Sequence, residues 1–171
     1  MEIFIKVTLP IITAVVLWFL KASKERGTIG LAIFAEIGAL CEIAEERKYL
    51  QALKAAAQEL RDRAPEDVTG RATVVKISDD YCRVYASNLE QIGKLDADEA
   101  GLVVRFYQYV DSVIQDITEG GVIANGVHEA EVYEGTIVVF EKALAAAEKL
   151  RSLREMKAAQ PWYKKLLRAI G

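Results

Sequence analysis

The chain has 171 residues, the size of one ordinary domain plus a short appendage, and its formal net charge is −3. This slightly acidic balance excludes a general nucleic-acid binder, which would concentrate Lys and Arg on one face. The two cysteines, Cys41 and Cys82, lie on separate segments, match no zinc or redox spacing, and suit packing roles in a reducing compartment.

The first element in chain order is the apolar run from Ile3 to Leu20, which predicts a membrane anchor. As a helix it would measure roughly 27 Å, slightly less than a hydrocarbon core about 30 Å thick. Lys21, Lys24 and Arg26 follow the run, whereas Glu2 precedes it. By the positive-inside rule this asymmetry predicts a single span, an external N-terminus and a cytoplasmic remainder, as in a bacterial inner-membrane protein.

Three other interpretations of this run stay open on the sequence alone. A cleaved secretory signal is one, although Leu20-Lys21-Ala22 is a poor cleavage site. A core helix of a soluble protein is another, because the run is short. The third is a membrane hairpin with residues 29–44 as the second span, which would place Glu36 near mid-bilayer at a cost of about 2.5–3.5 kcal/mol.

The remaining pattern predicts an all-α fold, in which an antiparallel helical bundle over residues 28–158 follows an anchor and basic flank over residues 1–27. Gly27 comes after a cluster of cations and predicts a helix end, so Thr28 is expected to cap the next helix. That helix should continue to about Arg63, because Ala-rich and charge-rich sequence favours a helix until a proline stops it.

Two shorter helices and one long helix should follow. Ser78 predicts the start of a helix that ends at Gly93 in a left-handed turn. Asp96 predicts the cap of a helix over 97–119, and the last helix should span about 128–158. The β-branched runs 73–77 and 136–140 leave open the alternative of a small two-stranded ribbon.

Glu36 is the most unusual charged residue, because its neighbours three and four positions away on a helix are all apolar. We expect it either to face solvent through a gap or to be buried with a partner, and Arg105 is the first candidate because it also interrupts an apolar segment. Arg83 is the second candidate. The lone His128 is expected at the surface or at a helix start.

Three polar and aromatic residues, Tyr85, Asn88 and Tyr107, lie on the two helices that are expected to pair. They predict a small polar-aromatic pocket, with core and rim packing as the alternative. No pattern indicates a catalytic residue, a cofactor site or a metal site.

The C-terminal segment, residues 159–171, is predicted to be a short basic amphipathic tail. Trp162 lies on its apolar side, and Lys164, Lys165 and Arg168 lie on the other. Such segments contact anionic membrane surfaces or dock on a partner, and folding back on the same domain is the alternative.

The chain resembles a group of small single-span bacterial and prophage proteins, membrane-anchored and helical, whose function is unassigned. The likeness covers about half of the chain and rests on Ala35-Glu36-Ile37, Tyr85-Ala86-Ser87-Asn88-Leu89, Ile92-Gly93, Leu95, Val103-Val104 and Phe106-Tyr107. The resemblance implies a bacterial or prophage origin and an all-helical body, and it implies no activity.

From these features we expect a non-enzymatic interaction or regulatory module that is held at the membrane. Its expected partners are the membrane and either another protein or a second copy of the chain. The alternative is a membrane-associated protein that binds a small ligand between its helices.

Overall fold

A computed structural model describes residues 2–63 and 70–160 of the chain. Within residues 2–26 it describes the helical backbone and the side chains of Leu17, Trp18, Lys21 and Lys24. Every regular element in the described residues is a helix, so the predicted all-helical fold class is confirmed. The anchor's other side chains and the tail from Pro161 onward lie outside the described residues.

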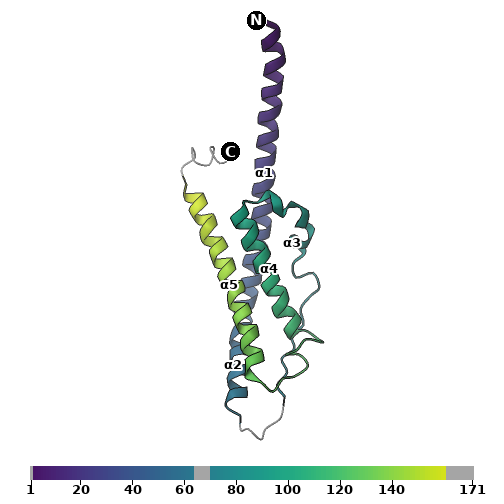
Figure 1. Ribbon diagram of the computed structural model, residues 1–171, viewed down its shortest axis with the longest axis vertical. Helices are drawn as coiled ribbons and strands as arrows, with labels where there is room; N and C mark the ends of the chain where they lie inside the picture. The colour runs from purple at the N-terminus through teal and green to yellow at the C-terminus, as the bar shows by residue number, and fades with distance from the viewer. Residues whose placement is uncertain (1, 64–69, 161–171) are drawn as a thin grey trace.

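The first element, α1 (Glu2–Glu46), is a single helix of 45 residues, about 68 Å long at 1.5 Å per residue. Its first half projects beyond the other helices, and its second half packs beside them (Figure 1). The hairpin interpretation is therefore wrong, because the chain does not reverse between the two apolar runs.

The predicted helix end at Gly27 is also wrong. Gly27 is helical and exposed, and the Thr28 hydroxyl donates a hydrogen bond back to the Lys24 carbonyl oxygen (3.0 Å) instead of capping a new helix. A single glycine costs a helix only about 1 kcal/mol, so good helix formers on both sides carry the helix through it. α1 thus joins the apolar N-terminal run to the rest of the chain without a hinge.

The helix predicted to reach Arg63 is interrupted at Arg47 and Lys48. Lys48 adopts φ 54° and ψ 35°, the left-handed region, and α2 (Tyr49–Arg61) starts immediately after it. A left-handed conformation is uncommon for a residue with a side chain, and no Gly or Pro marks the break in the sequence.

An extended segment, residues 70–77, follows α2 and lies beside the loop after α4. Its backbone hydrogen bonds join Arg71 with Val127, Thr73 with Ile123 and Val75 with Ile117. The alternative of a ribbon with residues 136–140 is wrong, because those residues lie inside the expected long helix. Side chains in the segment alternate between exposed and half-buried, the pattern of a chain with one face on a core.

One predicted helix, from Ser78 to Gly93, is replaced by two short elements, α3 (Arg83–Ser87) and the 3₁₀ helix η1 (Leu89–Lys94). The Ser78 hydroxyl oxygen accepts only a local hydrogen bond from the Asp80 amide (3.3 Å). Gly93 is not in the left-handed region, so the expected turn there is wrong: the 3₁₀ geometry of η1 already tightens the chain toward the next helix.

Two long helices, α4 (Ala97–Ile117) and α5 (Ala130–Ala159), run antiparallel (Figure 1). Both agree with the predicted ranges, and Gly120 has φ 88° just after α4. Asp96 is the N-cap residue of α4 as predicted, although its carboxylate makes no capping hydrogen bond and instead accepts one from Lys157 (2.5 Å).

The buried side chains form two clusters along the helices. The first core consists of Ile29, Ile33, Ile37, Ile92, Leu95, Leu102, Val103, Phe106, Tyr107, Ala143, Ala146 and Leu150. The second core consists of Leu53, Ala56, Ala57, Leu60, Val113, Ile117, Ile123, Val127, Ala130, Tyr133, Ile137 and Phe140. α1 contributes three isoleucines to the first core, whereas α2 serves the second.

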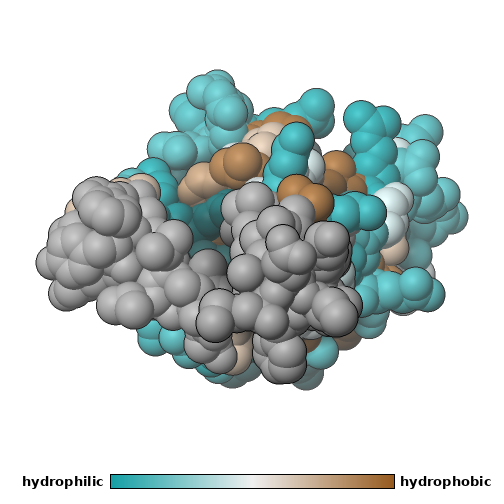
Figure 2. All heavy atoms as spheres, turned by 90° about the horizontal axis from the view of Figure 1, so that it is seen from above, coloured by the Kyte–Doolittle hydropathy of each residue, from teal (hydrophilic) through white to brown (hydrophobic). Residues whose placement is uncertain are grey.

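Among the described side chains, one segment of α1, Gly27–Glu46, is long and apolar enough by composition to cross a membrane. Only 22 % of it is buried, and the buried part belongs to the first core. From above, mainly hydrophilic residues form the visible periphery, and a smaller hydrophobic patch shows beside the atoms of uncertain placement (Figure 2). The packed half of α1 therefore combines a buried apolar stripe with exposed apolar residues such as Leu31.

Candidate functional site

Glu36 lies at the polar edge of the first core and accepts three hydrogen bonds. The donors are the backbone amides of Val84 (2.8 Å) and Tyr85 (2.9 Å) and the hydroxyl of Tyr107 (2.6 Å). The two amides belong to the first turn of α3, whose N-cap residue Cys82 makes no side-chain capping bond. Glu36 thus supplies the acceptors that α3 lacks locally, and its negative charge suits a helix N-terminus.

The predicted pair of Glu36 with Arg105 does not form. Arg105 is exposed, and its Nε donates to the Gly101 carbonyl oxygen one turn earlier on α4 (3.1 Å). Arg83, the second candidate, is also exposed. Since Phe106 and Tyr107 face the first core, the geometry of the helix turns Arg105 to the other side.

Two of the three residues predicted to form a pocket are in direct contact. The rings of Tyr85 and Tyr107 stack with centroids 3.8 Å apart and an interplanar angle of 14°. Burial, reinforced by the hydrogen bond to Glu36, raises the pKa of Tyr107 well above its usual range. Asn88 lies nearby and donates to the Val84 carbonyl oxygen (2.8 Å). This arrangement is packing, the alternative interpretation, and the pocket described below is lined by other residues.

A cluster of charges joins the end of α5 to α1 and α4. Arg154 donates to the Gly30 carbonyl oxygen (2.6 Å) and lies over the Phe34 ring, 5.1 Å from its centroid. Lys157 bonds to Asp96 (2.5 Å) and Glu99 (2.9 Å). Burial works to lower the pKa of Lys157, and the hydrogen bonds to the two carboxylates outweigh it and raise that pKa. The last turns of α5 are thereby fixed where the projecting half of α1 leaves the packed helices.

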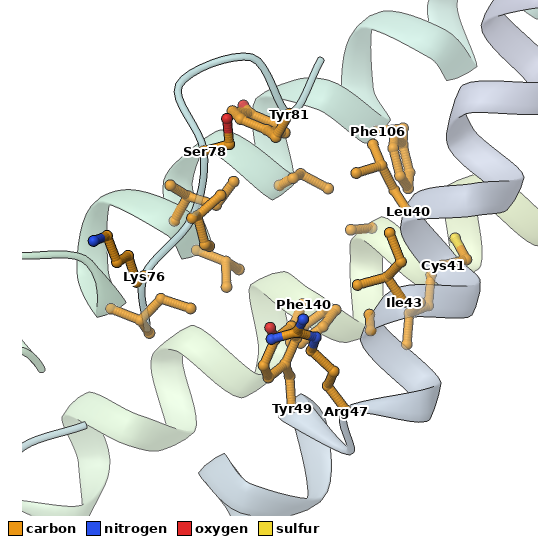
Figure 3. A pocket seen from close by; sticks show the side chains of 18 residues that line it. Leu40, Cys41, Ile43, Arg47, Tyr49, Lys76, Ser78, Tyr81, Phe106 and Phe140 are labelled. Atoms are coloured by element: carbon orange, nitrogen blue, oxygen red, sulfur yellow. The ribbon is translucent and has the colours of Figure 1, made fainter. Parts of the chain in front are cut away.

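A pocket lies between the two cores, beside the end of α1 (Figure 3). Its volume is about 380 Å³, within the range of small-molecule sites. It is lined by Leu40, Cys41, Ile43, Ala44, Arg47, Tyr49, Lys76, Ile77, Ser78, Tyr81, Phe106, Val110, Val113, Ile114, Ile117, Phe140, Ala143 and Leu144. Most of these side chains are hydrocarbon, with a few polar groups at the edges.

The break between α1 and α2 explains where the pocket lies. Phe106 and Ala143 of the first core line one side, and Val113 and Phe140 of the second core line the other. α1 stops before it can cover the junction, and α2 starts in a new direction after Lys48. The extended segment closes the remaining side with Ile77, a half-buried residue.

The polar groups of the pocket lie at its rim. Figure 3 shows Arg47 and Tyr49 at one end beside Phe140, and Ser78 with Tyr81 at the opposite side. The Tyr81 hydroxyl donates to Asp111 (3.2 Å), and burial, followed by nearby Cys82 and Asp111, raises its pKa. The lining contains two cations and no carboxylate.

Sequence reasoning did not find this pocket, although it named several of its residues for other reasons. The alternation in residues 73–77 was the one local signal, because it predicts a face against the core. His128 is exposed, as expected. Trp162, Lys164, Lys165 and Arg168 lie outside the described residues.

Among the described side chains, no three His, Cys, Asp or Glu residues are grouped so that they could hold a metal ion. Comparison of the chain with protein-family models, with curated proteins and with solved structures finds no match.

Proposed function

We propose that this protein is a membrane-anchored helical bundle that binds a small apolar molecule in the pocket between its two cores. The observation that carries the proposal is the pocket itself: about 380 Å³, lined mainly by hydrocarbon side chains, with a few polar groups at the rim. Ligand sites have this composition, because apolar contacts supply affinity and a few polar groups fix orientation. Of the two roles expected from the sequence, the geometry thus favours ligand binding.

In this proposal residues 3–20 cross a bacterial inner membrane and the packed helices lie in the cytoplasm. The asymmetry of cations around the run supports this orientation, and the unbroken, projecting α1 supports a direct link. Leu17 and Trp18 are 60 % and 66 % exposed, which suits side chains that face the hydrocarbon of a membrane.

Residues 27–46 are not the span in this proposal, although their composition would allow it. Glu36 bonds to α3 and α4, and Arg154 bonds to the backbone at Gly30. A bilayer around this segment would also immerse the exposed charges of the neighbouring helices, at several kcal/mol each. The C-terminal tail starts from this same end of the packed helices, which supports its proposed contact with the membrane surface.

The test uses the full-length protein in lipid nanodiscs and a photoactivatable probe, decanol with a diazirine at the chain end. Labelled peptides are mapped by mass spectrometry in the wild type and in two variants. Val110→Phe fills the pocket, whereas Val138→Phe makes the same change at an exposed site of α5. We expect labelling of pocket residues in the wild type and in Val138→Phe, and its loss in Val110→Phe. Equal labelling of all three proteins would refute the proposal.

A second candidate role, contact with a protein partner or a second copy, is favoured by the outer face of α1. Leu31 is 63 % exposed there, and the exposed Ala35 and Ala39 follow it one and two turns later. The molecular mass of the protein–nanodisc complex measures copy number directly. A dimer that Leu31→Glu returns to a monomer would support self-association through this face, and a monomer at all concentrations would exclude it.

A further inference from the structure

We propose that the pocket takes a single-chain amphiphile with an anionic head group, held by Arg47, and a chain on the order of ten carbons in the apolar interior. This inference rests on the function proposed above and adds the chemical class of the ligand. The head-group chemistry is that of a carboxylate or a phosphate, both of which a guanidinium binds well.

The charge of the lining is the first argument. The protein has a net charge of −3, yet the pocket is lined by Arg47 and Lys76 and by no Asp or Glu. Within the described residues neither of these two side chains forms an ion pair or a hydrogen bond. By contrast, ion pairs engage Arg61, Arg63, Arg71, Arg151 and Arg154. An anionic group is therefore the ligand feature that the rim can bind and that the described residues do not supply.

The position of Arg47 is the second argument. It lies in the turn between α1 and α2, with an exposed side chain, and in Figure 3 it reaches toward the pocket beside Tyr49 and Phe140. Lys76 points outward at another edge in the same view. The Tyr49 hydroxyl lies at the Arg47 end and adds a donor, so one end of the pocket offers a guanidinium and a phenol to one head group.

The residues at the opposite rim disfavour a ligand that binds with its head group at that end. Tyr81 there is bonded to Asp111, whose second oxygen accepts from Gln115 (2.9 Å). An anionic head group at that end would meet the Asp111 carboxylate and be repelled, whereas a hydrocarbon chain would not. The chain thus extends from Arg47 past Val110 and Ile114.

The volume sets the chain length. A methylene group is about as large as a water molecule, roughly 30 Å³, so about 380 Å³ accommodates on the order of ten methylenes. This volume is too small for both chains of a phospholipid, so single-chain species are favoured.

The experiment compares three probes that share a ten-carbon chain with a terminal diazirine: decanoate, decyl phosphate and decanol. Full-length protein in nanodiscs is titrated with each probe, and only labels on pocket-lining residues are counted. We expect both anions to label the pocket at about tenfold lower concentration than decanol. The tighter of the two anions identifies the head group, and equal values support the shared chemistry.

The matched variants are Arg47→Gln and Arg105→Gln, and both remove the charge of an exposed arginine. Arg47 lies at the pocket, whereas Arg105 lies away from it. Arg47→Gln should weaken labelling by the anions about tenfold and leave decanol unchanged, while Arg105→Gln should change neither. If decanol matches the anions and Arg47→Gln has no effect, the anionic ligand is refuted and the pocket proposal stands. If none of the three probes labels the pocket, the proposed function fails as well.

Discussion

At Glu36 the sequence predicts that a carboxylate has partners but does not identify them. An acid surrounded on its helix by apolar residues predicts a buried carboxylate with a partner, and the partly buried Glu36 has three. The sequence could not identify them, because two are backbone amides 48 and 49 positions away. These amides are available as donors only because they lie in the first turn of a five-residue helix. Sequence patterns point to charged side chains as partners, so they pointed to Arg105.

Replacing Glu36 should therefore destabilise the packed helices. Glu36→Ala leaves two amides and the Tyr107 hydroxyl without their acceptor, and we expect a loss of about 2–4 kcal/mol of unfolding free energy. Glu36→Gln keeps one carbonyl oxygen and should cost about half as much. Chemical denaturation of the full-length protein measures both, with Glu42→Ala, an exposed position on the same helix, as the control. Values within about 0.5 kcal/mol of wild type for Glu36→Ala would show that this capping contact contributes little.

Three tyrosines that are partly or fully buried make stability depend on alkaline pH. Burial, as the largest cause, raises the pKa of Tyr81, Tyr85 and Tyr107. A group whose folded pKa exceeds its unfolded value of about 10 gives its full stabilisation below pH 10 and loses it as the pH rises further. Stability should thus be level up to about pH 10 and fall above it.

Absorbance at 295 nm tests this, with circular dichroism recorded in parallel. Tyr81, Tyr85 and Tyr107, whose pKa burial raises, should ionise together with unfolding. Tyr107→Phe should reduce the slope of unfolding free energy against pH by up to about 1.4 kcal/mol per pH unit above pH 10. Ionisation of these three tyrosines before unfolding would contradict the raised pKa values.

At the scale of elements, strong periodic segments were predictable and local interruptions were not. α4 and α5 follow from long apolar stripes and clear end signals. Gly27 carried equally clear end signals, yet α1 passes through it, while Lys48 carried none and α1 ends beside it. Helix ends depend on small free energies, about 1 kcal/mol each, that packing on neighbouring helices readily outweighs.

The substitution Gly27→Ala distinguishes a continuous α1 from a helix that ends at Gly27. In a continuous helix with open space around Gly27, alanine should stabilise the protein by about 0.5–1 kcal/mol. If Gly27 were instead a left-handed residue at a helix end, alanine would be strained and would destabilise it. Gly38→Ala is the matched control, because Gly38 also lies inside α1 with nothing within 4 Å of an added Cβ. Opposite signs for the two substitutions would contradict an unbroken α1.

At the scale of the whole molecule, the sequence was sufficient for an all-helical fold and insufficient for the pocket. The fold class follows from composition and periodicity, which many residues share. The pocket depends on one break in one helix, and on an extended segment that meets the loop after α4 through a few backbone hydrogen bonds. No residue type signals the break, and the hydrogen bonds join residues that are far apart in the sequence.

The proposed orientation predicts the behaviour of reporters fused after Gly171. A fluorescent protein should be bright and alkaline phosphatase inactive, because the three cations after the apolar run favour the cytoplasmic side. Changing Lys21, Lys24 and Arg26 together to Gln should reduce this bias, whereas changing Lys142 and Lys149 on exposed parts of α5 should leave it intact. An active phosphatase on the unaltered chain would reverse the orientation and restore the secretory interpretation.

The unbroken length of α1 sets the route by which a ligand could arrive. From Leu20 to Glu46 the helix rises about 39 Å, so in the proposed arrangement the pocket opens far from the lipid. A hydrophobic molecule could not slide sideways out of the bilayer into such a site; it would have to dissolve first and diffuse through water as a monomer. Occupancy would then follow the dissolved concentration of the amphiphile rather than its total amount in the cell. A rigid helix would in this way make the protein sensitive to the fraction of amphiphile that has left the membrane.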